Sequence, residues 1–133
     1  MMPQERKQII LGPISPAAGG TLYQQIVDRL KREVGAGRLE PGAALPSFRQ
    51  LAEDLLVSVI TVKRAYEELE REGIIYRRQG LGTFVADRGP DRSREAKLNT
   101  AQDLFGQAAR EAAEAGLKQA DILELAHKVI KGK

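Results

Sequence analysis

The sequence predicts a mainly α-helical protein that carries one small β-hairpin. Apolar residues recur at helical spacing in three stretches between residues 21 and 72, and in two more stretches beyond residue 96. Between these groups, two short runs rich in β-branched and aromatic residues flank Gly80-Leu81-Gly82, a pattern typical of a hairpin. Helices therefore dominate the prediction, and the hairpin separates an N-terminal group of three from a C-terminal pair.

The first helix is expected to begin after Thr21, a residue type that caps helix N-termini with its hydroxyl. Gly35 and Gly37 end it, and the segment LEPGAAL at 39–45 is expected to be a turn. Its inward stripe comprises Leu22, Tyr23, Ile26, Val27, Leu30 and Val34.

Two further helices are expected to follow, separated by only a few residues. The second begins at Ser47, three residues before Gln50, which is the spacing of a capping box. The third begins at Ser58 and ends at Gly73, a residue suited to the position just after a helix. The inward residues are Leu51, Ala52 and Leu55 on the second helix, and Val62, Ala65, Tyr66 and Leu69 on the third.

The stretch RRQGLGTFV at 77–85 could either cradle a phosphate between its glycines or form the turn of a hairpin. Phosphate loops of the dinucleotide type need a helix after the glycines, whereas the β-rich run TFVA follows here. A hairpin is therefore expected. Because it comes directly after two closely spaced helices, residues 21–86 are predicted to form a winged helix-turn-helix domain. The alternative is an unspecialised three-helix domain with a trailing hairpin.

The remaining segments flank this domain. Residues 1–20 end in Pro and Gly and are expected to form an N-terminal arm, in which IIL at 9–11 is an edge strand or a staple onto the core. Residues 87–95, DRGPDRSRE, are expected to be a polar linker.

Residues 96–133 carry two amphipathic helical stretches separated at Gly116, which predicts a short C-terminal helical hairpin. A hairpin of this size is too small to bury a core alone or to enclose a metabolite. We therefore expect it to pack against a second copy of itself as a dimerisation tail, with alanines at 108, 109, 112 and 113 allowing close approach.

The composition excludes several classes of function. The 133 residues include no Cys and one His, so thiolate metal sites, cysteine nucleophiles and most acid–base constellations are excluded. We expect no catalytic residue, no metal site and no cofactor, and His127 is expected to be packed or exposed rather than a ligand. No apolar run approaches 18 residues and a secretory signal is not evident, which predicts a cytoplasmic protein that does not enter a membrane.

The net charge of +3 is a weak indication of an anionic partner. Residues 21–90 carry eleven Lys and Arg against ten Asp and Glu. A prediction of nucleic-acid binding must therefore rest on where the charges lie.

Three ordered motifs in residues 21–86 resemble the winged helix-turn-helix domain of the GntR family of bacterial transcription regulators. They are LPSFRQLAEDL at the second helix, TVKRAYEELEREG along the third, and GLGTFVA at the hairpin. The form TVKRAY and the short tail look most like the YtrA subfamily. The resemblance implies specific binding of double-stranded DNA by a two-fold dimer, usually to repress transcription. It also implies a tail that dimerises and holds no large effector domain, so no small-molecule effector is named.

The resemblance also implies roles for particular residues. Arg49 matches the family's DNA-contacting Arg at the start of the second helix. Thr61 and Arg64 match positions of the recognition helix that contact phosphate or bases. Gly80 and Gly82 match the glycines that let the tip of the wing enter the minor groove.

This chain departs from the family pattern at two places. Leu56 occupies a turn position that often carries Gly, and Leu is strained in left-handed backbone, which favours a turn built differently. Residues 58–60 read Ser-Val-Ile where the subfamily often has Asn-x-Asn. Since Val59 and Ile60 cannot hydrogen-bond to base edges, two alternatives stay open for them: contact with a thymine methyl group or packing in the core.

The residues themselves also favour a DNA-binding face. The third helix is basic and hydroxyl-bearing near its N-terminus and acidic later, which fits a helix that enters DNA by its N-terminal end. The alternatives are a solvated face with Lys63–Glu67 and Arg64–Glu68 pairs, and hairpin arginines that merely protect an exposed edge. The predicted DNA-binding residues are Ser47, Arg49, Ser58, Thr61, Lys63, Arg64, Arg77, Arg78, Gln79, Gly80 and Gly82.

The sequence thus predicts a sequence-specific DNA-binding transcriptional regulator, a homodimeric repressor that binds an inverted-repeat operator and dimerises through its C-terminal helices. The alternative is a winged-helix protein–protein interaction module without DNA binding, which the Ser-Val-Ile stretch and the near-neutral domain charge favour.

Overall fold

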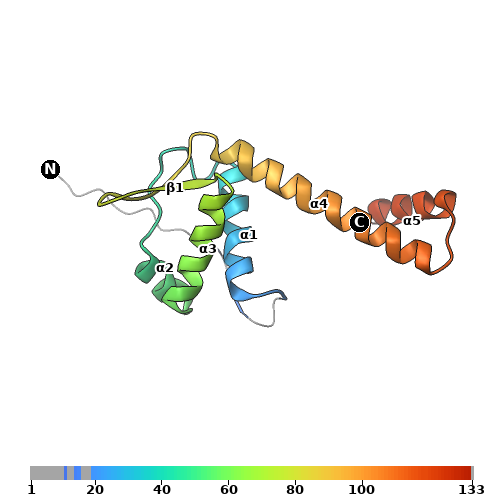
Figure 1. The fold of residues 1–133 in the computed structure, drawn as a ribbon, viewed down its shortest axis with the longest axis horizontal. Coiled ribbons are helices and arrows are strands. Elements are labelled where there is room, and N and C mark those ends of the chain that lie inside the picture. Colours follow the sequence, from blue (N-terminus) through green and yellow to red (C-terminus); the bar gives the residue numbers. More distant parts are fainter. Residues whose placement is uncertain (1–10, 12–13, 16–18, 133) are drawn as a thin grey trace. The chain divides into compact units, whose positions relative to one another are not determined.

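The structure is a computed structural model and describes residues 11, 14–15 and 19–132. The chain divides into two compact units, of which unit 1 ends at Ala96 and unit 2 begins at Lys97 (Figure 1). The elements in chain order are α1 (Leu22–Gly35), α2 (Phe48–Leu55), α3 (Val59–Arg71), β1 (Ile75–Arg78), β2 (Gly82–Val85), α4 (Gly89–Glu114) and α5 (Gln119–Lys131). Three helices followed by a two-stranded hairpin confirm the predicted winged helix-turn-helix.

The first three helices begin at the residues predicted to cap them. The hydroxyl oxygens of Thr21, Ser47 and Ser58 each accept a hydrogen bond from a backbone N–H three residues later, at 3.2, 3.1 and 3.1 Å. Each cap satisfies one of the N–H groups that lack a partner inside the helix. The starts of these helices are therefore fixed by local sequence.

The core of unit 1 lies between α1 and α3, with α2 packed against α3. Tyr66 of α3 is buried, donates a hydrogen bond to the carbonyl oxygen of Pro46 at 2.9 Å, and meets the ring of Phe48 edge to face at 5.2 Å. Burial raises the pKa of the Tyr66 hydroxyl far above its usual value. These contacts hold the start of α2 against α3. The largest fully buried side chains are Ile26, Val27, Leu30, Val34, Leu51, Val62, Tyr66, Leu69, Ile74, Val85 and Ser93.

The hairpin pairs β1 and β2 in antiparallel register, with Ile75 opposite Val85 and Arg78 opposite Gly82. The turn predicted at 39–45 also lies along the other edge of β2. The N–H of Leu45 donates to the carbonyl of Thr83 at 2.8 Å, and the N–H of Val85 donates to the carbonyl of Ala43 at 2.9 Å. Backbone pairing of this kind leaves no side-chain pattern, so it could not be predicted from the sequence.

Residues 87–95 were predicted as a polar linker, but from Gly89 onward they form the first turns of α4. Pro90 fits the first turn of a helix, where its missing N–H costs nothing. Gly89 packs so closely that a Cβ there would lie 2.7 Å from the carbonyl oxygen of Ile74. Ser93, which is buried, donates a hydrogen bond to the carbonyl oxygen of Lys31 in α1. A Gly-Pro break and polar residues therefore mark the docked start of a helix rather than a linker.

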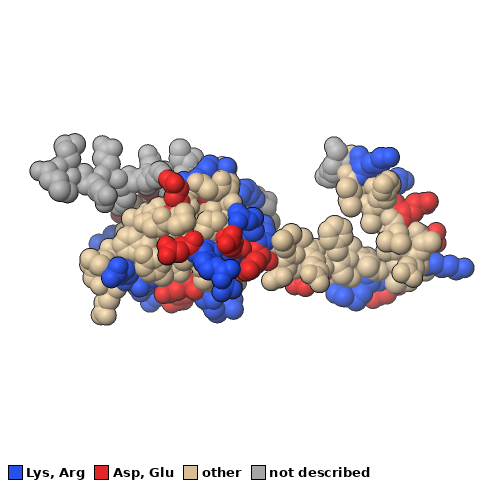
Figure 2. All heavy atoms as spheres, turned by 90° about the horizontal axis from the view of Figure 1, so that it is seen from above, with Lys and Arg blue, Asp and Glu red and all other residues tan. Residues whose placement is uncertain are grey.

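Unit 2 is a helical hairpin made by the rest of α4 and by α5, joined through Gly116 at a φ of 98°. Among its described residues, Ala112 alone is buried. Its charged side chains lie mainly along the outer edges (Figure 2). Between the helices, an open apolar groove of about 340 Å³ is lined by residues that include Phe105, Ala108, Ala112, Ile122, Ala126 and Val129.

Most of the predicted N-terminal arm falls outside the described residues. Leu11 is buried in the core of unit 1 and its carbonyl accepts a hydrogen bond from Arg29, while Gln25 bonds to the backbone of Ser15. Of the segment 9–11, predicted as an edge strand or a staple onto the core, the structure describes only Leu11, and its burial in the core fits the staple. In the part of the chain that the structure describes, none of the helices has the length and apolar character needed to cross a membrane.

Candidate nucleic-acid interface

The N-terminal end of α3 exposes the polar groups expected of a helix that meets an anion. The hydroxyl oxygens of Ser58 and Thr61 lie 2.8 Å apart, and Ser58 also accepts from the Thr61 N–H. The first intrahelical bond runs from the N–H of Val62 to the carbonyl of Ser58 at 3.3 Å. The N–H groups of Val59 and Ile60 precede that bond, at the positive end of the helix dipole.

The turn between α2 and α3 has the left-handed geometry that Leu56 was expected to disfavour. Leu56 has φ 58° and ψ 45°, so the expectation of a differently built turn is wrong. Its N–H points to the carbonyl of Glu53 at 3.3 Å, and the N–H of Val57 donates to the carbonyl of Ala52 at 3.0 Å. These bonds close the end of α2, in a conformation that costs a residue with a Cβ about 1–2 kcal/mol.

Val59 and Ile60 lie on the surface. Their exposed fractions are 43% and 78%, so the alternative that Ile60 packs in the core is wrong. The side chains that α3 buries are instead Val62, Ala65, Tyr66 and Leu69, as predicted.

Three of the predicted basic residues are exposed and unpaired. Arg49 lies in the first turn of α2, Lys63 in the second turn of α3, and Arg78 at the end of β1. Within the described residues, none of these three side chains forms an ion pair or a hydrogen bond. They are thus available to an anionic partner.

The two other arginines of the predicted site rest on aromatic rings. The guanidinium carbon of Arg64 lies 3.8 Å from the centre of the Tyr23 ring of α1. That of Arg77 in β1 lies 4.8 Å from the centre of the Phe48 ring at the start of α2. Such contacts hold a cation in place without neutralising it. They also bring the wing next to α2, and the recognition helix next to the start of α1.

These two contacts between arginines and aromatic rings were not predicted from the sequence. Tyr23 was expected only to widen the inward stripe of the first helix, and Phe48 had no predicted role. Both arginines are far from their rings along the chain, so no local spacing could have shown the pairs.

The wing places its two glycines in backbone that favours glycine. Gly80 has φ 78° and Gly82 has φ 124°. A Cβ at Gly80 would meet nothing within 4 Å, so the requirement there is conformational rather than steric. Arg77, Arg78 and Gln79 are exposed beside this tip.

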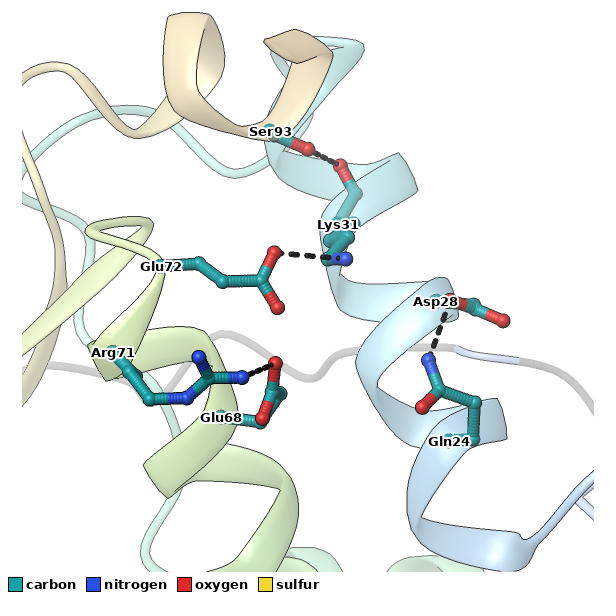
Figure 3. Close-up of polar contacts among 7 residues, drawn as sticks. All are labelled: Gln24, Asp28, Lys31, Glu68, Arg71, Glu72 and Ser93. Atoms are coloured by element: carbon teal, nitrogen blue, oxygen red, sulfur yellow. Dashed lines mark hydrogen bonds and ion pairs between the residues drawn. The ribbon is translucent and has the colours of Figure 1, made fainter. Parts of the chain in front are cut away.

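One ion pair between α1 and the C-cap of α3, and a second pair within α3, lie at the opposite end of the recognition helix (Figure 3). The ammonium group of Lys31 lies 2.9 Å from a carboxylate oxygen of Glu72, and Arg71 pairs with Glu68. Burial and the neighbouring Glu68 carboxyl raise the pKa of Glu72, although Lys31 opposes the shift. The hydrogen bond from Arg71 lowers the pKa of Glu68. Two carboxylates at the acidic end of α3, those of Glu68 and Glu72, thus have basic partners.

The predicted alternative pairs on α3 do not form. Among the described residues, neither Lys63 with Glu67 nor Arg64 with Glu68 makes an ion pair. Figure 2 shows basic and acidic side chains interspersed over unit 1 on the face it presents. The character of the candidate surface therefore comes from unpaired cations at three places, not from a broad basic field.

The part of the chain that the structure describes holds no group of three or more His, Asp or Glu residues that could bind a metal ion.

Comparisons with known proteins agree with this geometry. The family model described as "Bacterial regulatory proteins, gntR family" matches residues 22–85. The HTH-type transcriptional repressor YtrA of Bacillus subtilis is 35% identical over 118 residues, which are 89% of this chain and 88% of YtrA.

Solved structures show the same similarity. A GntR family transcriptional regulator from Listeria monocytogenes is 31% identical with a TM-score of 0.66, covering 82% of this chain and 95% of that chain. The DNA-binding domain of AraR in complex with operator ORX1 is 29% identical with a TM-score of 0.50, covering 59% of this chain and 93% of that chain. The predicted family resemblance is confirmed.

Proposed function

This chain belongs to the GntR family of bacterial regulatory proteins, and we propose that it represses transcription as a homodimer bound to an inverted-repeat operator. Members of this family are transcriptional regulators rather than enzymes, and the similar AraR domain is bound to an operator in its solved structure. In this proposal the protein acts in the cytoplasm, and each winged domain reads one half-site of double-stranded DNA.

The observation that carries the DNA-binding part is the distribution of cations in unit 1. Arg49, Lys63 and Arg78 are exposed and unpaired within the described residues, while Arg64 and Arg77 are held on rings. By contrast, Lys31, Arg38 and Arg71, near the C-terminal ends of α1 and α3, are paired with carboxylates, although Arg32 in the last turn of α1 is exposed. Unpaired cations beside a helix N-terminus and on a wing support contact with DNA phosphates on both sides of an inserted helix.

Each predicted site residue has a place in this proposal. Ser47 and Ser58 cap the two helices, and Thr61 adds a hydroxyl beside the phosphates. Lys63 contacts the DNA backbone, and Arg49 and Arg64 reach base edges or phosphates. Arg77 and Arg78 lie beside the wing tip, where an arginine reaches a phosphate or the minor groove. Gln79, Gly80 and Gly82 form the wing tip that follows the minor groove. The DNA-binding domain runs from Thr21 to Ala96, because the first turns of α4 dock onto α1 within unit 1.

The dimeric part of the proposal rests on unit 2. Leu104, Phe105, Leu123, Val129 and Ile130 are each more than half exposed, and the groove between α4 and α5 is apolar. A helical hairpin of fewer than 40 residues buries too little apolar surface to be stable alone, so another surface must pack against it. A second copy provides that surface in a two-fold arrangement, the commonest symmetry of homodimers.

A second candidate function is a protein–protein interaction module without DNA binding. It is favoured by the exposed apolar side chains of Leu56, Val59 and Ile60 at the start of α3. Salt dependence separates the two functions. Each phosphate contact to DNA releases counterions and lowers the logarithm of affinity by about 0.9 per tenfold rise in salt.

The experiment compares Arg49→Ala with the wild type on DNA fragments that the wild type retains. We expect Arg49→Ala to weaken binding by about 1–3 kcal/mol if Arg49 reads a base, or to reduce the salt slope by about one if it contacts phosphate. Arg32→Ala removes an exposed arginine near the end of α1 and serves as the control. Equal affinities and equal salt slopes for all three proteins would remove Arg49 from the interface.

A further inference from the structure

Three apolar residues, Leu56, Val59 and Ile60, form an exposed patch at the N-terminal end of the recognition helix. The exposed fractions are 91%, 43% and 78%, so the side chains of Leu56 and Ile60 are largely in contact with water. Isolated apolar side chains on a surface are common, but three within five residues form a patch that calls for a partner.

The surroundings of the patch point to a polyanion. Ile60 shares the outer face of α3 with Lys63 and Arg64, three and four residues along the helix, and lies next to Thr61. The opposite face is the one that packs in the core. No carboxylate neutralises Lys63 or Arg64 within the described residues. An apolar protein surface would have to desolvate these cations, whereas nucleic acid pairs with them.

The apolar group that the major groove of DNA offers is the 5-methyl group of thymine. A β-branched side chain has one strongly preferred χ1 rotamer in a helix, so Ile60 presents its two γ carbons in a fixed direction. It has no hydrogen-bonding group and therefore cannot distinguish bases by donors and acceptors. Contact with a methyl group is the base readout left to it.

We propose that Ile60 is a specificity-determining residue that contacts the 5-methyl group of one thymine in each operator half-site. This inference rests on the proposed function, in which the N-terminal end of α3 enters the major groove. It predicts that each half-site contains a position where thymine is required for its methyl group rather than for its base pairing.

The test uses a duplex that the full-length protein itself selects from genomic DNA. Each thymine of one half-site is replaced in turn by deoxyuridine, which removes the 5-methyl group and keeps the base pair. At one position the wild type should bind about fourfold more weakly, the equivalent of ~0.8 kcal/mol for one buried methyl-sized group at 1.4 kcal/mol per tenfold. Ile60→Ala should bind the thymine and deoxyuridine duplexes equally.

Two variants act as controls. Ile60→Val keeps two methyl groups and should retain part of the dependence on thymine. Lys63→Ala should weaken binding by the same factor on both duplexes, because a phosphate contact is indifferent to the methyl group. Ile60 is exposed, so its substitution should leave the helical circular dichroism signal unchanged.

The outcomes separate the inference from the function on which it rests. The protein could retain a specific duplex while no deoxyuridine substitution affects the wild type more than Ile60→Ala. In that case the methyl contact is wrong, and the proposed repressor function is unaffected. If no duplex is retained at physiological salt, the proposed function fails as well, and the apolar patch becomes a surface for a protein partner.

Discussion

At the scale of single residues, the backbone at Leu56 combines strain with exposure. Its φ of 58° is the one positive φ among the described residues other than glycine, and its side chain is 91% exposed. The side chain therefore gains little from burial while the backbone carries the cost of a Cβ in left-handed geometry.

Leu56→Gly should therefore stabilise the protein. Relief of the Cβ strain exceeds the extra freedom that Gly gives the unfolded chain, leaving a net gain of about 0.5–1 kcal/mol. Chemical denaturation of the two proteins measures this difference. Leu56→Ala is the matched control, because it removes the exposed side chain but keeps the Cβ, and it should leave the stability unchanged. An equal gain in both variants would assign the effect to the side chain instead of the backbone.

The role of a residue could be predicted from the sequence when its contacts lie only a few residues away along the chain. Thr21, Ser47 and Ser58 were identified as caps because the groups they bond lie three residues away. The support of Arg64 by Tyr23 was invisible because the pair joins α3 to α1. The exposure of Ile60 was left open because the inward stripe of a helix does not fix how its neighbours are covered.

At the scale of elements, the Lys31–Glu72 pair links the ends of α1 and α3. The Lys31 side chain is 7% exposed and that of Glu72 is 20% exposed, so this pair is largely removed from water. Removal of one partner leaves the other charge buried without compensation, which is costly.

Lys31→Met should destabilise the protein by about 2–3 kcal/mol at neutral pH, measured by denaturation. The loss should shrink as the pH falls. The pKa of Glu72 is already raised by burial, and removal of Lys31 raises it further, so the folded state takes up the proton more readily than the unfolded state. Acid therefore favours folding of this variant relative to neutral pH.

The matched control is Arg38→Met, which removes an exposed cation from a pair with Glu33 on the same unit. Exposed ion pairs contribute little to stability, so this variant should unfold at the same denaturant concentration as the wild type. A similar loss in both variants would show that the buried pair has no special weight.

The prediction of elements succeeded where each helix carries its own signals and failed at the start of α4. Gly89-Pro90 and a run of charged residues are typical of a linker, yet Gly89 allows close approach to Ile74 and Ser93 bonds to α1. The pairing of residues 43–45 with β2 was likewise invisible, because it uses backbone groups alone.

At the scale of the whole molecule, the exposed groove of unit 2 should hold the dimer together. Val129→Asp places a charge in that groove and should convert a dimer into a monomer in sedimentation experiments. The affinity for an inverted repeat should fall with it, because two half-sites would no longer be bound by one particle. Gln107→Asp adds the same charge at an exposed position of α4 outside the groove, and should remain dimeric. A dimeric Val129→Asp protein would place the interface elsewhere.

The central claim is that this protein is a homodimeric repressor that reads an inverted repeat. The most direct measurement is to incubate the full-length protein with fragmented genomic DNA from its source, at low and at physiological salt, and to sequence what is retained. We predict that retention persists at physiological salt and converges on a short inverted repeat whose half-sites are centred about one helical turn apart. Retention that is diffuse at low salt and absent at physiological salt would contradict the claim.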